Sequence, residues 1–180
     1  QSAVNIATNA IDCIHTTAAS HGRVFIVEVM GHKVGWLTLH AGIAGGADII
    51  LLPEIPYDID SVIKALEKRT KEGKRFLAVA EGAISKEDAA LSKKELKAKR
   101  KANPYPSISY QVGKEIEERT GQEVRITVPG HMQRGGEPCP YDRVISSRLG
   151  AAAANLIIEE KYGYMVGLCN GETVPVTLEE

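Results

Sequence analysis

The sequence has few aromatic residues, few cysteines and almost no imbalance of charge. Aromatic residues make up 5% of the 180 residues while hydrophobic residues make up 43%, so we expect an interior built mainly from aliphatic side chains. The 22 basic and 23 acidic residues give a formal net charge of −1, which excludes a global attraction to nucleic acid or to an anionic membrane. Cys13, Cys139 and Cys169 are odd in number, far apart and without a CxxC pair. This spacing argues against a disulfide framework and a zinc knuckle, and we predict reduced thiols and no metal site.

A long hydrophobic run is also missing. The most apolar stretch, residues 41–52, is interrupted by Asp48 and is too short to span a bilayer, and no basic-then-apolar leader opens the chain. We therefore predict a cytoplasmic protein without a membrane partner. The chain begins without Met, directly inside a helical pattern, and it closes just after an apparent strand. We expect a piece of a longer protein.

Strand and helix patterns alternate along most of the chain. Nearly continuous apolar or β-branched runs, typical of parallel strands covered on both faces, predict strands at residues 23–30, 48–53, 75–80 and 124–128. Helical patterns lie before, between and after these runs, and Asn-Gly at 170–171 predicts a β-hairpin near the end. The order predicts an α/β fold: a single domain over residues 1–180, with a three-layer α/β/α sandwich and a mostly parallel, Rossmann-like sheet. We expect the hairpin to lie at the edge of that sheet.

Turn and capping residues give the expected bounds of the helices. Asp58 or Asp60 is expected to cap a helix that ends at Gly73, with Lys71 and Lys74 near its negative end. Ser107 is expected to cap the helix before residue 124, and Pro140 suits the first turn of a long helix that ends near residue 161.

The stretch from Ser85 to Pro106 interrupts the alternation. It is rich in lysine and is halted by Pro104 and Pro106, so we interpret residues 85–106 as an exposed helical excursion from the sheet. A nucleic-acid interface is the alternative reading of the lysines, but the stretch lacks interleaved aromatic residues before Tyr105. We predict a solvated helix face and no nucleic-acid partner.

Polar residues follow three of the predicted strands. Met30-Gly31-His32 follows the first strand, Glu81-Gly82 follows the third, and the loop GHMQRGG at 130–136 follows the fourth. Ligands of open α/β sheets collect at the carboxyl ends of parallel strands, so we expect these segments to converge. Together they would offer a carboxylate for sugar hydroxyls, the imidazoles of His32 and His131, and the guanidinium of Arg134 for phosphate oxygens. That combination suits a phosphorylated sugar; the alternative is that each is an ordinary loop or capping residue.

Three segments together resemble a known family. The segments are VEVMGHKVGWLTLHAGIAGGADIILLPEIPYD, VAEGA and TVPGHMQRGGEPCPYDRVISSRLGAAA, in this order. They resemble the carboxyl-terminal part of the 6-phosphofructokinases, over nearly the whole chain. The resemblance implies half of a two-domain fold, in which one domain binds the phosphoryl donor and the other fructose 6-phosphate. It also implies the glycolytic transfer of a phosphoryl group from ATP to the 1-hydroxyl of fructose 6-phosphate, with this chain as the sugar-phosphate-binding domain.

The resemblance also implies roles for individual residues. Met30, Gly31 and Glu81 would line the sugar, and His131 and Arg134 would hold it and its 6-phosphate. Arg23 and Arg125 would correspond to arginines that reach the 6-phosphate from a neighbouring subunit. The resemblance thus implies a homo-oligomer, a dimer or tetramer.

Two departures limit these implications. The family's usual MGR is MGH here, so His32 stands where an arginine is expected to stabilise the transferring phosphoryl group. The donor loops and the catalytic Asp of the family would precede Gln1, so the chain alone is not expected to catalyse. Mg²⁺ would come with the phosphoryl donor, which is expected to be ATP. Pyrophosphate is the alternative donor, because the excursion at 85–106 resembles insertions in branches of the family that include pyrophosphate-using enzymes. A further alternative, suggested by His32, is a non-catalytic regulatory protein that binds a sugar phosphate.

Overall fold

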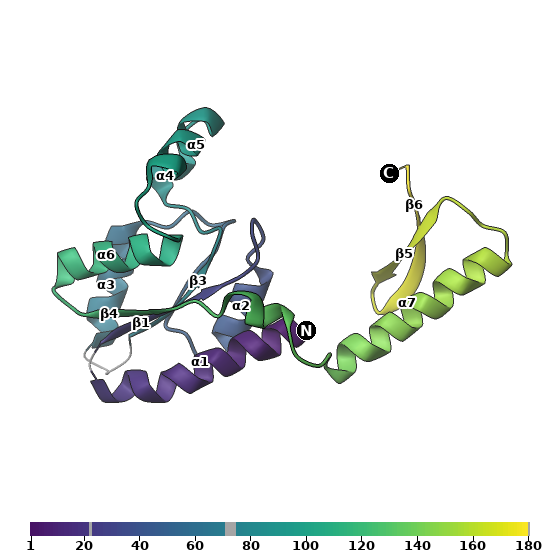
Figure 1. The fold of residues 1–180 in the computed structure, drawn as a ribbon, viewed down its shortest axis with the longest axis horizontal. Helices are drawn as coiled ribbons and strands as arrows, with labels where there is room; N and C mark the ends of the chain where they lie inside the picture. The colour runs from purple at the N-terminus through teal and green to yellow at the C-terminus, as the bar shows by residue number, and fades with distance from the viewer. Residues whose placement is uncertain (22, 71–74, 180) are drawn as a thin grey trace. The chain divides into compact units, whose positions relative to one another are not determined.

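The structure, a computed structural model, describes residues 1–21, 23–70 and 75–179 and divides the chain into two compact units. Residues 3–136 form the larger unit, and residues 1–2 with 137–180 form the smaller one. The elements are, in chain order (Figure 1), α1 (Ser2–His21), β1 (Val24–Val29), α2 (Trp36–Ala44), β2 (Ile49–Leu51), α3 (Ile59–Thr70), β3 (Phe76–Ala80), α4 (Lys86–Ala89), α5 (Lys93–Ala102), α6 (Ile108–Thr120), β4 (Val124–Thr127), the 3₁₀-helix η1 (Gly130–Arg134), α7 (Pro140–Ile158), β5 (Tyr164–Cys169) and β6 (Glu172–Thr177). The predicted alternation of helix and strand is confirmed.

A four-stranded parallel sheet is the centre of the larger unit. Its strand order is β2-β3-β1-β4, so β1 lies between β3 and β4. Val29 at the end of β1 pairs with Ala80 at the end of β3, and Val27 pairs with Thr127 at the end of β4. The three strands therefore end close to the same edge of the sheet, and the predicted α/β fold is confirmed.

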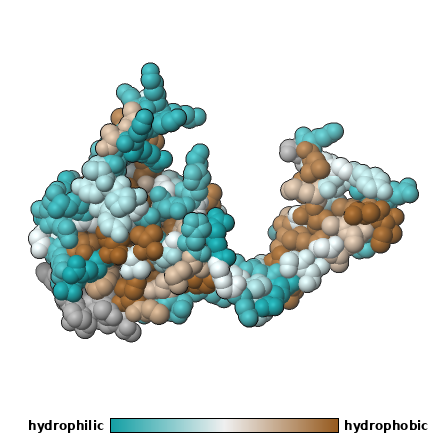
Figure 2. Space-filling view, in the orientation of Figure 1, coloured by the Kyte–Doolittle hydropathy of each residue, from teal (hydrophilic) through white to brown (hydrophobic). Residues whose placement is uncertain are grey.

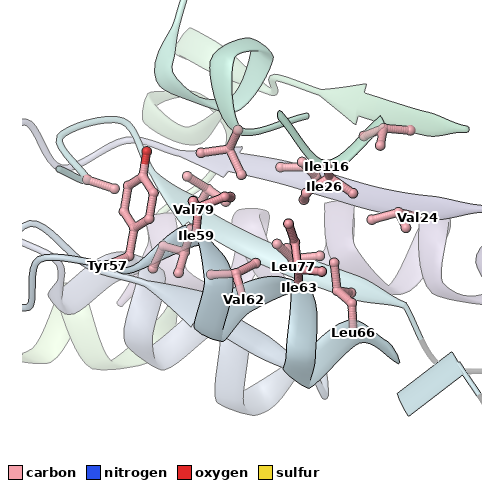
Figure 3. Packing of buried hydrophobic residues seen from close by; sticks show 14 residues of the cluster. Val24, Ile26, Tyr57, Ile59, Val62, Ile63, Leu66, Leu77, Val79 and Ile116 are labelled. Carbon is pink, nitrogen blue, oxygen red and sulfur yellow. The ribbon is translucent and has the colours of Figure 1, made fainter. Parts of the chain in front are cut away.

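The sheet is covered on both faces, which explains the continuous apolar runs of β1 and β3. Val24 and Ile26 point to a cluster that includes side chains of α3 and α6, such as Leu66 and Ile116 (Figure 3). The intervening residues of β1 point to the other face and pack with Ala7 of α1 and with α2. Burial of these aliphatic side chains, each worth about 1.5–3 kcal/mol, holds the three layers together.

A buried carboxylate of β1 fixes the start of α6. Glu28 is 6% exposed, and its Oε2 accepts hydrogen bonds from the hydroxyl of Ser107, at 2.5 Å, and from the backbone N–H of Ser109, at 3.1 Å. Ser107 is at the N-cap position, as predicted, but its side chain makes no capping bond to the helix. Glu28 supplies the acceptor instead, because the first amides of a helix have no partner within it.

Residues 85–106 form two short helices. Ser85 caps α4, and Ser92 and Glu95 form a capping box at the start of α5. No residue of α5 is buried. Figure 1 shows α5 projecting from the rest of the larger unit, and Figure 2 colours much of this projection as hydrophilic.

The smaller unit contains α7 and a β-hairpin. Pro140 opens α7, as predicted. The hairpin of β5 and β6 turns at Asn170-Gly171, where both residues have positive φ, at 50° and 84°, as a type I′ turn requires. The prediction that the hairpin lies at the edge of the parallel sheet is wrong, since β5 and β6 form a two-stranded sheet of their own. Several apolar side chains of this unit are exposed (Figure 2): Val144, Ile157, Ile158, Met165 and Leu168.

Some of the predicted ends of helices and strands differ from those in the structure. Asp58 caps α3 through bonds from the N–H of Asp60 and the hydroxyl of Ser61, and the Ser61 bond lowers the pKa of Asp58. The predicted end of this helix, at Gly73 with Lys71 and Lys74, lies outside the described residues. The strand expected to reach residue 128 ends at Thr127, because the backbone turns directly into η1 where an irregular loop was expected.

Candidate functional site

The candidate site is built from three segments that follow β1, β3 and β4. Met30–His32 follows β1, Glu81 and Gly82 follow β3, and η1 follows β4. Because β1 is the middle of these three strands, its following segment has a neighbour on either side. We call these three segments the cup.

Glu81 holds the segment after β1 from one side. Its Oε1 accepts hydrogen bonds from the backbone N–H of Gly31, at 3.2 Å, and of His32, at 2.6 Å. In the part of the chain that the structure describes, no hydrogen bond is recorded for its other oxygen, Oε2. One oxygen therefore shapes the loop, and the second can accept from a ligand hydroxyl.

Two glycines allow this close packing. Gly31 has φ 155°, and an added Cβ would lie 2.4 Å from the carbonyl oxygen of Val34. A Cβ on Gly82 would lie only 1.7 Å from the carbonyl oxygen of His32. Because His32 itself has φ 52°, in the left-handed region, the backbone here is fixed by its surroundings rather than by its own preference.

Gln133 holds the same segment from the other side. Its side-chain Oε1 accepts a hydrogen bond from the N–H of Met30 at 3.1 Å, and its Nε2 donates to the carbonyl oxygen of Gly130 at 3.1 Å. Sequence reasoning missed this residue as part of the site. The signal was its place between His131 and Arg134, but only the fold shows that its side chain is buried.

His131 and Arg134 form the side of the cup that offers side-chain N–H donors. Both are exposed and lie on η1, and no hydrogen bond or ion pair of either side chain is recorded among the described residues. A 3₁₀-helix has three residues per turn, so residues 131 and 134 lie on the same face of η1. An Arg beside an imidazole, facing outwards, is a suitable pair of donors for phosphate oxygens.

The structure therefore brings together the three segments whose convergence the topology predicts. Met30, Gly31 and Glu81 are linked directly or through shared partners to η1, which carries His131 and Arg134. The side chain of His32 is exposed beside them.

Arg23 and Arg125 are not part of this cup. Arg23 directly precedes β1 and Arg125 is the second residue of β4, opposite Phe25, so both lie at the other end of the strands. Met30 lies five residue steps along the chain from Phe25, which places Arg125 roughly 16 Å from the cup. Both guanidinium groups bind the carboxylate of Glu123. Within one chain they cannot join His131 and Arg134 at a ligand.

A cavity adjoins Glu81 on the side of the excursion. Its volume is about 560 Å³, and it is lined by residues after β3, by α4, α5 and the linker, and by α6. The charged and polar groups of its wall pair with one another: Lys99 with Asp88, Lys114 with Glu118, and Gln111 with Glu115. The bond to Asp88 raises the pKa of Lys99.

Other kinds of site find no support in residues 1–21, 23–70 and 75–179. No group of three or more His, Cys, Asp or Glu side chains is arranged to hold a metal ion. None of the described helices has the length and apolar character needed to cross a membrane. All three cysteines are free thiols.

Similar sequences and structures share one family. The family model described as Phosphofructokinase matches residues 1–157. The chain is 54% identical to the ATP-dependent 6-phosphofructokinase of Spirochaeta thermophila, aligned over 99% of the chain and 50% of that protein. It is 46% identical to the enzyme of the same name from Chloroflexus aggregans, over 99% of the chain and 49% of that protein. The chain thus spans about half the length of the curated relatives it matches.

Solved structures agree with this assignment. Phosphofructokinase from Saccharomyces cerevisiae matches with a TM-score of 0.81 at 32% identity, over 99% of this chain and 22% of that one. A pyrophosphate-dependent phosphofructokinase from Marinobacter aquaeolei matches with a TM-score of 0.76 over all of this chain and 46% of that one, and at 20% identity it shows the fold alone. Since the family model covers most of the residues and the relatives align from end to end of the chain, this chain belongs to the phosphofructokinase family.

Proposed function

We propose that the protein carrying this chain is an ATP-dependent 6-phosphofructokinase and that this chain supplies its fructose 6-phosphate site. The observation that supports the proposal is the cup itself, in which hydrogen bonds of Glu81 and Gln133 join three segments at the ends of adjacent parallel strands, and these segments carry one carboxylate, two histidines and one arginine. The names of the relatives support ATP as the donor, because those at 46–54% identity are called ATP-dependent. Pyrophosphate is the alternative donor, and it rests on the resemblance of the excursion at 85–106 to insertions in family branches that include pyrophosphate-using enzymes.

In this proposal each group of the cup has one task. Arg134 and His131 bind the 6-phosphate, which fixes one end of the sugar. Glu81 Oε2 accepts from a sugar hydroxyl, and the backbone of Met30 and Gly31 forms the floor. The reaction is then accelerated by orientation of the acceptor, which is the main contribution a protein makes to phosphoryl transfer. Mg²⁺ would enter with the donor, and no group of three or more His, Cys, Asp or Glu side chains among the described residues could hold it.

The position of Arg23 and Arg125 suggests a homo-oligomer. They lie too far from the cup of their own chain, so they can serve a sugar phosphate only in the cup of a neighbouring subunit, as the family resemblance implies. We propose a dimer or tetramer on this ground, with fructose 6-phosphate as the small-molecule partner. The cytoplasm is the compartment that we propose from the sequence. In the free chain their charge is balanced in part by Glu123.

His32 favours a second candidate, a regulatory protein that binds the sugar phosphate without catalysis. The residue stands where the family has the arginine expected to stabilise the transferring phosphoryl group. The two candidates differ in turnover but not in binding. A protein that binds fructose 6-phosphate and shows no turnover with ATP or pyrophosphate would favour the regulatory role.

The test is a calorimetric titration of the whole protein with fructose 6-phosphate. We expect Arg134→Ala to weaken binding by about 2 kcal/mol or more, the value of a charged hydrogen-bonding partner, which is roughly 30-fold in affinity. Fructose without a phosphate serves as the ligand control. Arg119→Ala serves as the matched variant, because Arg119 is exposed in the last turn of α6, which leads into the start of β4, at the end of the strands opposite the cup. Unchanged affinity in Arg134→Ala would reject the assigned phosphate site.

A further inference from the structure

Gln133 is the one residue of the sequence HMQR whose side chain is buried. It is 2% exposed, whereas its neighbours His131, Met132 and Arg134 are exposed. A buried amide must find hydrogen-bonding partners or lose stability, and Gln133 uses both ends of its side chain. It therefore has little room for direct contact with a ligand.

Its partners belong to two different segments of the cup. Oε1 receives the N–H of Met30, and Nε2 reaches back to the carbonyl oxygen of Gly130 at the start of η1. The side chain is thus a bridge between the segment after β1 and the segment after β4. The two bonds fix the distance between the loop after β1, which forms the floor for the sugar, and the turn that carries His131 and Arg134.

The same two bonds also fix the rotation of η1. With three residues per turn, residues 131 and 134 share a face, while residue 133 points elsewhere. Anchoring Gln133 inside the protein therefore holds His131 and Arg134 outwards together. Glu81 restrains the next two amides of the same loop, so three consecutive N–H groups, of residues 30 to 32, are held from both sides.

We infer that Gln133 is a positioning residue that couples the phosphate-binding face of η1 to the sugar-binding loop after β1. The inference rests on the proposed function, because it assumes that Arg134 holds the 6-phosphate. Gln133 acts through Arg134 and His131 and not by touching the substrate. Its effect should therefore concern fructose 6-phosphate and leave the phosphoryl donor largely unaffected.

Two substitutions separate the bonds. Gln133→Glu keeps the size and an acceptor for Met30, but it loses the donor to Gly130 and places two oxygens against each other. Gln133→Met keeps the length and loses both bonds. We expect the KM for fructose 6-phosphate to rise roughly 10- to 100-fold in both, the cost of displacing a binding group by about 1 Å, with the KM of the donor nearly unchanged.

A double substitution distinguishes positioning from a general loss of structure. If Gln133 acts through Arg134, then Gln133→Met should have little further effect on the KM once Arg134 is already Ala, because coupled residues are not additive. Ile116→Val is the stability control, since Ile116 is fully buried in α6 and its loss of one methyl costs about 0.5–1.5 kcal/mol without involving the cup. This variant should keep the KM at a lowered melting temperature.

The outcomes are distinct. A KM for fructose 6-phosphate within twofold of the parent value in Gln133→Glu would overturn the inference, and so would full additivity with Arg134→Ala. If Gln133→Met does not fold, the milder Gln133→Glu, alone and combined with Arg134→Ala, tests the inference. Failure of the parent protein to bind fructose 6-phosphate at all would instead reject the proposed function.

Discussion

The replacement Gly82→Ala tests how tightly the cup is packed. An alanine Cβ at this position would lie 1.7 Å from the carbonyl oxygen of His32, and the side chain of Pro53 would lie 3.3 Å away on another side. An ordinary contact between carbon and a carbonyl oxygen is about 3.3 Å, so the two backbone segments must separate by roughly 1.6 Å. The clash involves backbone, which cannot rotate away as a flexible side chain could.

The separation would break the bonds of the neighbouring Glu81. Its Oε1 now lies 3.2 Å from the nitrogen of Gly31 and 2.6 Å from that of His32, and a shift of that size lengthens both bonds beyond hydrogen-bonding distance. Bonds to a charged group contribute about 1.5–3 kcal/mol each, and exposure favours the low end, so losing both costs about 3 kcal/mol. Alanine lowers the entropy of the unfolded chain, which offsets about 0.4–1 kcal/mol. We expect a net loss of about 2 kcal/mol.

Calorimetric melting and titration with fructose 6-phosphate measure the two consequences. A loss of 2 kcal/mol corresponds to a fall of roughly 4–8 °C in a protein of this size or somewhat larger, and we expect weaker sugar-phosphate binding in parallel. Gly150→Ala is the control, because a Cβ at Gly150 meets no atom within 4 Å and α7 favours alanine over glycine. The reasoning would be refuted if Gly82→Ala melted and bound like this control.

Three further predictions concern buried or capped groups. Glu28→Gln should destabilise the protein by about 1–2 kcal/mol in urea denaturation, because the carboxylate that receives the N–H of Ser109 loses its charge; an unchanged midpoint would show that the charge is irrelevant to α6. Burial raises the pKa of Tyr57, whose hydroxyl has no recorded hydrogen-bond partner in the described residues. The contribution of the neutral phenol to the free energy of unfolding should therefore be complete below about pH 10, the ordinary pKa of tyrosine, and should decrease as the pH rises above it. Tyr57→Phe should remove this alkaline loss in melting curves, and its persistence would assign the loss to another group. Hydrogen bonds from Ser2 lower the pKa of Asp142 to about 2, so the stability it provides should be present above about pH 4 and be lost as the pH falls toward 2; carboxyl NMR titration of Ser2→Ala should show that pKa raised, and an unshifted value would contradict the assignment.

The sequence predicted what local pattern and burial determine. β1 and β3 are continuous apolar runs because helices cover both of their faces, and this pattern is visible in the residues themselves. That the segments carrying Glu81 and Arg134 follow strands that end at the same edge of the sheet could be predicted from the rule for parallel strands.

The remaining features depend on contacts between distant segments. Nothing local distinguishes the buried Gln133 from the exposed residues on either side of it, since its burial depends on the strand that lies beside η1. Glu28 is likewise an acidic residue in an apolar run, and only the position of α6 shows why it is there. The hairpin was misplaced for a related reason: its turn is a local property, but the sheet that it joins is not.

The excursion between β3 and α6 is fastened at both of its ends. Tyr57 exchanges backbone hydrogen bonds with Ile84 and Lys86 at the beginning, and Glu28 holds Ser107 and Ser109 at the end. The sheet and the cup therefore do not depend on what lies between these anchors. Closing a loop of twice the length costs only about 0.6 kcal/mol more, so this segment can change in length and sequence at little energetic cost. Residues 87–106 are accordingly a place where the chain can tolerate change, and where a fluorescent label or an affinity tag could be inserted without disturbing the strands that carry the cup.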